Sequence, residues 1–135
     1  MARRSRAREV VLQLLYQEDL NPGATASPEG FMVGRLRGDE DLVEFGKGLF
    51  SGVLRNREEL DEMLTQIAEN WTLSRMAVTD RNVLRLGAFE LLYTETPDRV
   101  AINEAVDLAR RFGSKQSSQF VNGILDRLLH KRDET

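Results

Sequence analysis

The densest group of side chains able to do chemistry is a run of arginines at the N-terminus. Arg3, Arg4, Arg6 and Arg8 lie in the first eight positions, which hold no acidic residue, although the 135-residue chain has a net charge of −3. Guanidinium groups are planar donors that match the geometry of phosphate oxygens. This basic tip on an otherwise acidic chain would attract a polyanion such as a nucleic acid.

The placement of these arginines favours binding over stability. Exposed cations near a helix N-terminus oppose the helix macrodipole by roughly 0.3–1 kcal/mol each. At helical spacing Arg4 and Arg8 share one face and Arg6 lies roughly opposite, so an arm that runs into a helix could grip a phosphate backbone from two sides. A solvated basic tail is the alternative interpretation, because a charge run often has no other role.

Two other places could contact a nucleic acid. Tyr16 falls at the edge of the apolar stripe of the first predicted helix, where it could stack on a base or pack its ring at the boundary with water. The loop 113–119 places Lys115, Gln116, Ser117 and Ser118 beside a predicted helix N-terminus. That arrangement suits an anion or ribose contact, and it equally suits an ordinary capped turn between helices.

The sequence shows no pattern typical of catalysis or metal binding. The absence of cysteine excludes a thiolate nucleophile and a cysteine-ligated zinc site, and the single histidine, His130, is expected at the surface. The phosphate-binding loop, the dinucleotide fingerprint, the nucleophile elbow and the HExxH pair are all missing. We therefore expect no enzyme, no cofactor and no metal. No apolar run approaches membrane-spanning length, so we expect a cytoplasmic protein without a membrane partner.

The elements that position these residues are predicted to be helices, because apolar residues recur at helical spacing. The expected ranges are 5–20, 40–56, 57–70, 80–93, 101–112 and 118–130, with a short helix at 31–36 inside the connection 21–38. The range 80–93 is apolar on almost every side, so other helices should surround it. We expect an all-α bundle of about six to seven helices in two three-helix-bundle-like halves. The single domain would cover 1–135, with halves of about 1–72 and 73–135.

Three stretches together resemble a known family. They are ARRSRAREVVLQLLYQ at the N-terminus, RNVLRLGAFELLY in the second half, and VAINEAVDLARRFG followed by SSQFVNGILDRLL near the C-terminus. In content, order and spacing they resemble the NusB family of transcription antitermination factors across nearly the whole chain. The stretch 21–56 matches little beyond its helical character. The resemblance implies the all-α NusB-like fold and no catalysis.

The resemblance also implies partners and site residues. The partners are single-stranded boxA-like RNA of ribosomal RNA leader transcripts, the small-subunit ribosomal protein NusE, and the transcription elongation complex. The implied RNA-binding residues, with Arg3 added from the basic run, are Arg3, Arg4, Arg6, Arg8, Tyr16, Asp80, Phe112, Lys115, Gln116 and Ser117. Two positions depart from some relatives: Ser5 interrupts the arginine run, and Gln116 replaces an acid. The first could lower RNA affinity, and the second could raise it by removing a like charge from the phosphates.

Two other interpretations stay open at this point. A NusB-like domain also occurs in ribosomal RNA cytosine methyltransferases, which need a second, cofactor-binding catalytic domain, and the start at Met1 and the polar end at Thr135 argue against that arrangement. The other is a helical protein-interaction adaptor whose basic arm only keeps it soluble. RNA binding that weakens steeply with salt and depends on sequence would separate an RNA-binding factor from the adaptor.

Overall fold

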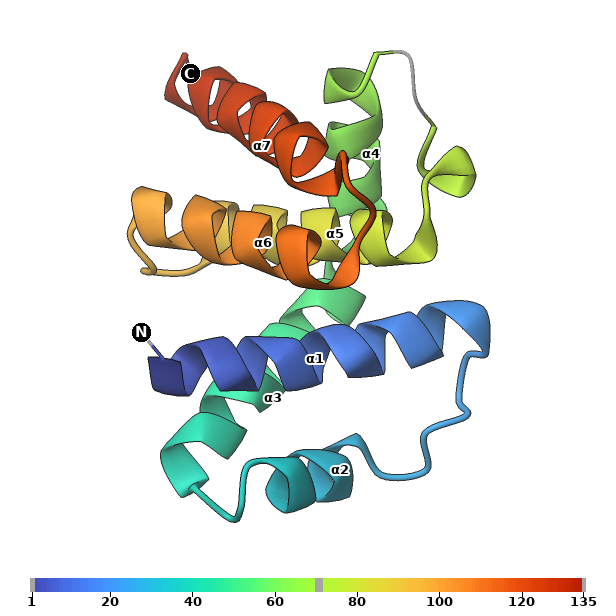
Figure 1. Ribbon diagram of the computed structural model, residues 1–135, viewed down its shortest axis with the longest axis vertical. Helices are drawn as coiled ribbons and strands as arrows, with labels where there is room; N and C mark the ends of the chain where they lie inside the picture. Colours follow the sequence, from blue (N-terminus) through green and yellow to red (C-terminus); the bar gives the residue numbers. More distant parts are fainter. Residues whose placement is uncertain (1, 70–71, 135) are drawn as a thin grey trace. The chain divides into compact units, whose positions relative to one another are not determined.

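The computed structural model describes residues 2–69 and 72–134, and helices make up most of them (Figure 1). No strand occurs in these two ranges, so the predicted all-α class is confirmed. The helices are α1 (Ala2–Leu20), α2 (Pro28–Arg35), α3 (Glu40–Arg55), α4 (Arg57–Ile67), the short 3-10 helix η1 (Leu73–Arg75), α5 (Val78–Tyr93), α6 (Asp98–Phe112) and α7 (Ser117–Asp133).

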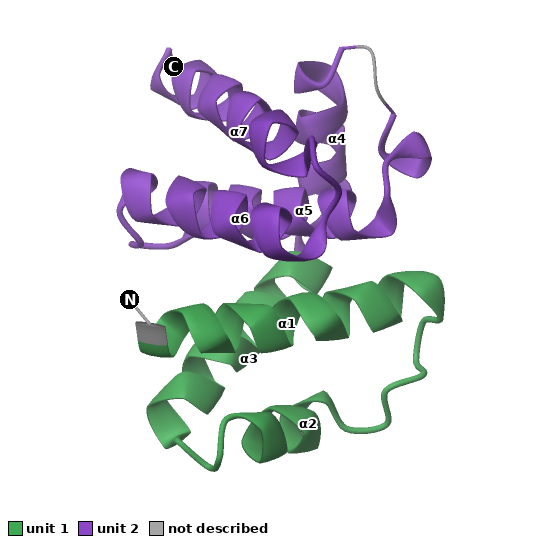
Figure 2. Cartoon of the chain, in the orientation of Figure 1, with its two compact units in different colours: residues 1–55 green, residues 56–135 purple. Residues whose placement is uncertain are grey.

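The chain divides into two compact units, Met1–Arg55 and Asn56–Thr135 (Figure 2). The sequence placed the division near residue 72, whereas the structure places it directly before α4. The reason is packing, because α4 contacts α5, α7 and η1. The described part of unit 1 therefore holds three α-helices, as expected for each half, and the described part of unit 2 holds four α-helices and η1. The predicted end of α4 at residue 70 lies outside the described residues, and α4 already ends at Ile67.

Unit 1 is built on the packing of α1 against α3, with α2 contacting both. The apolar stripe predicted for α1 is confirmed, since its members are buried: Val10, Val11, Leu14 and Leu15. The predicted helix 31–36 begins earlier, at Pro28, because Ser27 caps it. The Ser27 hydroxyl accepts a hydrogen bond from the Gly30 N–H at 3.0 Å, and proline is well tolerated in the first turn.

Unit 2 is organised around α5, which contacts α4, α6 and α7. The predicted enclosure is confirmed for most of the helix, since every residue from Asn82 to Leu91 is buried, whereas Tyr93 at its end is 43% exposed. Gly87 permits this close packing. A Cβ atom there would lie 2.8 Å from the Cδ1 atom of Leu125, closer than real Cβ atoms approach, and 3.0 Å from the Cβ atom of Ala105, which is a tight contact.

Three buried residues of α5 are polar, which the apolar pattern did not indicate. Arg85 is 4% exposed and donates to both carboxylate oxygens of Asp61, at 2.7 and 3.0 Å, and to the Asn82 side chain at 3.1 Å. The carboxylate of Glu90 accepts the Thr96 hydroxyl at 2.9 Å. Buried polar groups are tolerated when hydrogen bonds replace the lost water, so these contacts stabilise α5 inside the bundle.

Because other helices enclose α5, truncating its buried side chains should destabilise the protein. Leu84 is 0% and Leu91 is 3% exposed, so replacing either by Ala should lower the free energy of unfolding by about 2–5 kcal/mol through lost burial and a residual cavity. Urea denaturation followed by circular dichroism measures this loss. Leu20→Ala is the matched control, because Leu20 is 57% exposed and its removal should have little effect. Wild-type midpoints for both buried variants would contradict the central position of α5.

Candidate nucleic-acid interface

Three of the four N-terminal arginines are exposed on the first turns of α1. Arg3, Arg4 and Arg6 are exposed, whereas Arg8 is buried at 2%. Helix α1 begins at Ala2 rather than near Ser5, and its first turn contains no acidic residue. Arginine and alanine are good helix formers, which accounts for the earlier start. The arginines therefore project from a formed helix, not from an extended arm.

The ring of Phe45 on α3 holds two of these arginines. The guanidinium carbon of Arg4 lies 4.5 Å from the ring centroid, and that of Arg8 lies 5.1 Å from it. Cations over an aromatic face are attracted by the ring quadrupole. The exposed Arg4 is thus oriented without a carboxylate partner in the described part of the chain, while the buried Arg8 anchors the same helix face to α3. In this unit Arg4 can reach a ligand, and Arg8 has a supporting position.

Arg3 and Arg6 are partly neutralised by acidic neighbours. Arg3 donates to the Asp39 carboxylate at 2.5 Å, and Arg6 donates to Glu9 at 3.1 Å. The hydrogen bond and charge of Asp39 raise the pKa of Arg3, while Arg3 and the backbone N–H of Leu42 lower the pKa of Asp39. Both pairs are at the surface, where ion pairs contribute little stability. A phosphate can therefore compete for either guanidinium.

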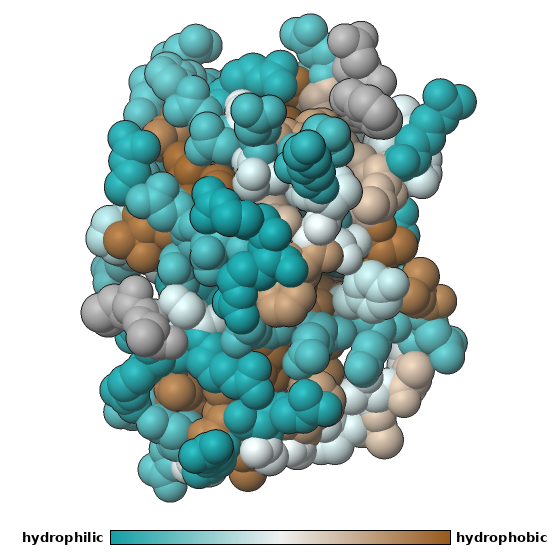
Figure 3. All heavy atoms as spheres, viewed as in Figure 1, coloured by the Kyte–Doolittle hydropathy of each residue, from teal (hydrophilic) through white to brown (hydrophobic). Residues whose placement is uncertain are grey.

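Tyr16 lies further along α1 and is 40% exposed. This agrees with its predicted place at the edge of the buried stripe. An aromatic ring with one open face can stack on an unpaired base. The surface drawn in Figure 3 is mostly hydrophilic, with isolated apolar residues between the polar ones.

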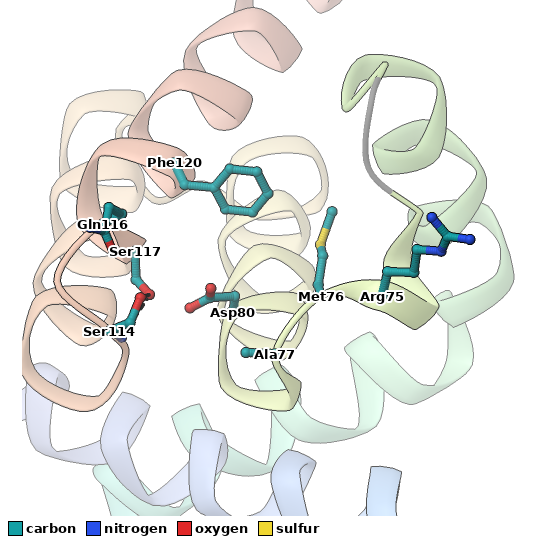
Figure 4. Close-up of a pocket in the computed structure, with 8 residues that line it drawn as sticks. All are labelled: Arg75, Met76, Ala77, Asp80, Ser114, Gln116, Ser117 and Phe120. Atoms are coloured by element: carbon teal, nitrogen blue, oxygen red, sulfur yellow. Dashed lines mark hydrogen bonds between the residues drawn. The ribbon is translucent and has the colours of Figure 1, made fainter.

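The remaining predicted residues belong to unit 2, where several of them line one hollow (Figure 4). Its volume is about 210 Å³, and its walls come from η1 and the residues after it, from α5, from the turn before α7 and from the start of α7. The lining residues are Arg75, Met76, Ala77, Asp80, Ser114, Gln116, Ser117 and Phe120. The structure thus brings together Asp80, Gln116 and Ser117, and it places Lys115 and Phe112 outside the lining.

Asp80 is the most unusual group in this hollow. Its Oδ1 atom is buried and has no hydrogen-bond partner among the described residues. Figure 4 shows its carboxylate between Met76 and the Ser114–Ser117 turn. Asp80 lies in the first turn of α5, where the helix macrodipole favours a negative charge. A buried carboxylate oxygen without a partner is costly unless a ligand supplies a donor, so the hollow suits a group with N–H donors.

The turn before α7 is held by Ser117. Its hydroxyl accepts a hydrogen bond from the Ser114 N–H at 2.8 Å and lies 3.1 Å from the Ser114 hydroxyl. Ser117 is 1% exposed, so its side chain shapes the turn and leaves Lys115 and Gln116 exposed. Phe112 is 48% exposed with the Arg111 guanidinium 4.9 Å from its ring centroid.

Several lining residues were not predicted as site residues, among them Arg75, Met76 and Phe120. Phe120 stands one helical turn after Gln116 on α7, and that spacing is the signal that could have identified it. His130 is exposed at the far end of α7, as predicted. Within the ranges that the structure describes, no group of three acidic or histidine side chains could hold a metal ion, and no helix has the length and apolarity to cross a membrane.

Comparison with known proteins identifies the family. The family model described as "NusB family" matches residues 5–130. The chain belongs to the NusB family. It is 43% identical over 128 residues to the transcription antitermination protein NusB of Anaeromyxobacter dehalogenans, covering 94% of this chain and 90% of that protein. The Myxococcus xanthus NusB is 44% identical over 133 residues, covering 95% of each.

Solved NusB structures share the fold. A crystal form of T. maritima NusB has a TM-score of 0.85 and 34% sequence identity, covering 95% of this chain and 91% of that one. A second structure, of the antitermination factors NusB and NusE in complex with double-stranded RNA, has a TM-score of 0.80 and 26% identity, covering 97% of this chain and 98% of the matched one. The family resemblance inferred from the sequence motifs is confirmed.

The double arginine contact on Phe45 leads to a prediction about unit 1. Phe45→Leu removes two guanidinium–ring contacts, worth about 0.5–1 kcal/mol for the exposed Arg4 and about 2 kcal/mol for the buried Arg8, so the free energy of unfolding should fall by about 2–3 kcal/mol. Phe31→Leu is the control, since a single guanidinium, that of Arg35, lies over its ring at 4.6 Å. Denaturant titration compares the two variants. An equal loss in both would show that Phe45 does not anchor the arginines.

Proposed function

We propose that this NusB family member binds boxA-type single-stranded RNA of ribosomal RNA leader transcripts and forms a complex with NusE in the transcription elongation complex. The observation that carries the RNA proposal is the exposure of Arg3, Arg4 and Arg6 on a helix start without acidic residues in its first turn. The role is binding without catalysis, and it places the protein in the cytoplasm.

The two units supply different kinds of contact in this proposal. The exposed arginines of unit 1 bind phosphates, which fix the position of the RNA but carry no sequence information. Tyr16 stacks on an unpaired base. In unit 2, the free Oδ1 atom of Asp80 accepts an N–H from a base edge, with Gln116 and Phe120 on the walls of the same hollow. Base edges are accessible to such a pocket in a single strand and not in the deep groove of an RNA duplex.

The NusE partnership rests on likeness to the NusB of the solved NusB–NusE–RNA complex, which extends over 97% of this chain. That RNA is described as double-stranded, so single-stranded and duplex RNA both belong in the binding test. The competing adaptor role predicts binding to NusE without sequence-dependent RNA binding. A titration with boxA RNA, a scrambled strand and a duplex, each with and without NusE, separates these roles.

The arginine contacts predict a change in salt dependence. Each phosphate contact to single-stranded RNA contributes about −0.7 to the slope of log affinity against log salt. Arg4→Ala/Arg6→Ala should therefore flatten the slope by up to about 1.4, and it should weaken boxA and scrambled RNA by similar factors. Fluorescence anisotropy across a salt series measures both effects. Arg55→Gln/Arg99→Gln removes two exposed arginines elsewhere and should leave the slope unchanged. An unaltered slope in the Arg4→Ala/Arg6→Ala variant would contradict the proposed phosphate contacts.

Replacing Asp80 by Asn tests how this residue acts. The direction of the change in RNA affinity distinguishes recognition of a base by the carboxylate from a purely electrostatic effect. If charge alone mattered, Asp80→Asn would tighten RNA binding, because it removes a negative group from the path of phosphates. If the carboxylate accepts base N–H groups, the variant should lose about 1–3 kcal/mol of affinity for boxA RNA and much less for the scrambled strand. The control is Glu95→Gln, which removes one exposed carboxylate of the same unit outside the hollow. Tighter binding by Asp80→Asn would contradict the proposed reading role.

A further inference from the structure

A second basic hollow lies in unit 1, away from the residues that the family resemblance supplied. It is lined by side chains of α1, of the end of α2, of the turn that follows and of the first turn of α3, and its volume is about 360 Å³. The lining residues are Arg3, Arg6, Arg35, Leu36, Arg37 and Leu42. The buried Leu36 and Leu42 form an apolar floor under four guanidinium groups. Figure 1 shows the start of α1 and the α2–α3 turn on the same side of unit 1.

The conformation of Arg37 is unfavourable for an arginine. Its φ is +56°, in the left-handed region, and it follows Leu36, the C-cap of α2. The Gly38 N–H donates to the Val33 carbonyl at 2.9 Å, which is the closing hydrogen bond of a Schellman motif. Glycine or asparagine normally occupies the left-handed position of this motif, because a larger side chain strains the backbone there. Helix termination alone does not account for arginine at this site.

The two arginines of the turn lack the acidic partners that the α1 arginines have. Within the described residues, Arg3 pairs with Asp39 and Arg6 with Glu9. Arg35 contacts the Phe31 ring, and Arg37 has no ion pair or side-chain hydrogen bond in the same part of the chain. Both side chains are exposed. The hollow therefore holds two guanidinium groups whose charge no carboxylate offsets.

Charges on the turn are segregated between two hollows. Among the described residues, the basic hollow has no acidic residue in its lining, whereas a neighbouring hollow is lined by Glu29, Glu40 and Glu44 together with Val33, Gly38 and Val43. A turn that only needed solubility would have no reason to separate its charges in this way. Asp39 pairs with Arg3 at the basic hollow, but the arginine side of the turn remains the more attractive to anions and the glutamate side the more repulsive, so an extended polyanion would follow the arginine side.

We propose that the α2–α3 turn is a second phosphate-binding subsite, in which Arg35 and Arg37 bind the backbone of the RNA strand held by α1. This inference rests on the proposed RNA binding and extends it to a further stretch of the strand. Arg3 and Arg6 line the basic hollow as well as α1, so the two contacts are continuous. Guanidinium groups bind phosphate through paired N–H donors, which suits them to a phosphate that follows this turn.

The test uses Arg35→Gln/Arg37→Gly in the full chain with fluorescein-labelled boxA RNA. The variant removes both free charges and relieves the left-handed strain, so its thermal midpoint should equal or exceed that of wild type. The slope of log affinity against log salt should become flatter by about 1.4, at about 0.7 per lost contact. Arg35→Lys/Arg37→Lys keeps the charges and should keep the slope. Arg55→Gln/Arg99→Gln is the charge-matched control and should behave like wild type.

The outcomes separate this inference from the proposed function. A flattened slope in the turn variant and in Arg4→Ala/Arg6→Ala, with an unchanged control, supports both. A turn variant that matches the control while Arg4→Ala/Arg6→Ala loses slope overturns the subsite and leaves the α1 contacts standing. A wild-type protein without salt-dependent RNA binding overturns both. If only the turn variant had a flatter slope, the α1 arginines would not contact the RNA. The turn could then not be a second subsite that extends an α1 site.

Discussion

Burial of α5 on every side requires α4, α6 and α7 to pack around one helix, and Gly87 sets how closely α6 and α7 approach it. The same constraint positions the candidate site of unit 2. Asp80 lies in the first turn of α5, and the Ser114–Ser117 turn joins two of the helices that enclose α5. Because these helices cannot shift without opening the core, packing fixes the positions of Asp80 and Phe120, while the hydrogen bonds of Ser117 hold the turn that forms another wall of the hollow.

Apolar periodicity was sufficient to predict the helices and most of the core. It identified the apolar stripe of α1 and the central position of α5, because the residues that a helix buries are mostly apolar and recur at helical spacing. The division between the units was misplaced, since periodicity describes each helix and not the partner on which it packs. Helix α4 has an ordinary amphipathic pattern that would suit either unit. Its contacts with α5 and α7 could be known only from three dimensions.

The site residues were predictable to a lesser degree, because exposure depends on tertiary contacts. The four N-terminal arginines look equivalent in sequence, yet Phe45 of α3 holds Arg8 in a buried position and leaves Arg4 exposed. Likewise, serine hydroxyls often contact ligands, but the Ser117 hydroxyl already accepts a hydrogen bond from the Ser114 N–H within its own turn. The sequence pattern did not indicate a functional role for Phe120 or Arg37. Their importance comes from a shared hollow in one case and from a left-handed backbone in the other.

Asp39 and Glu9 act as counterions that the protein carries within unit 1. A phosphate that binds Arg3 or Arg6 must first displace a carboxylate, so part of the Coulomb attraction is cancelled by the ion pair that breaks. Such an exchange weakens the capture of any polyanion by charge alone. In the proposed RNA complex, arginines that already have acidic partners would contribute less to affinity, and selectivity would depend more on the groups that recognise bases.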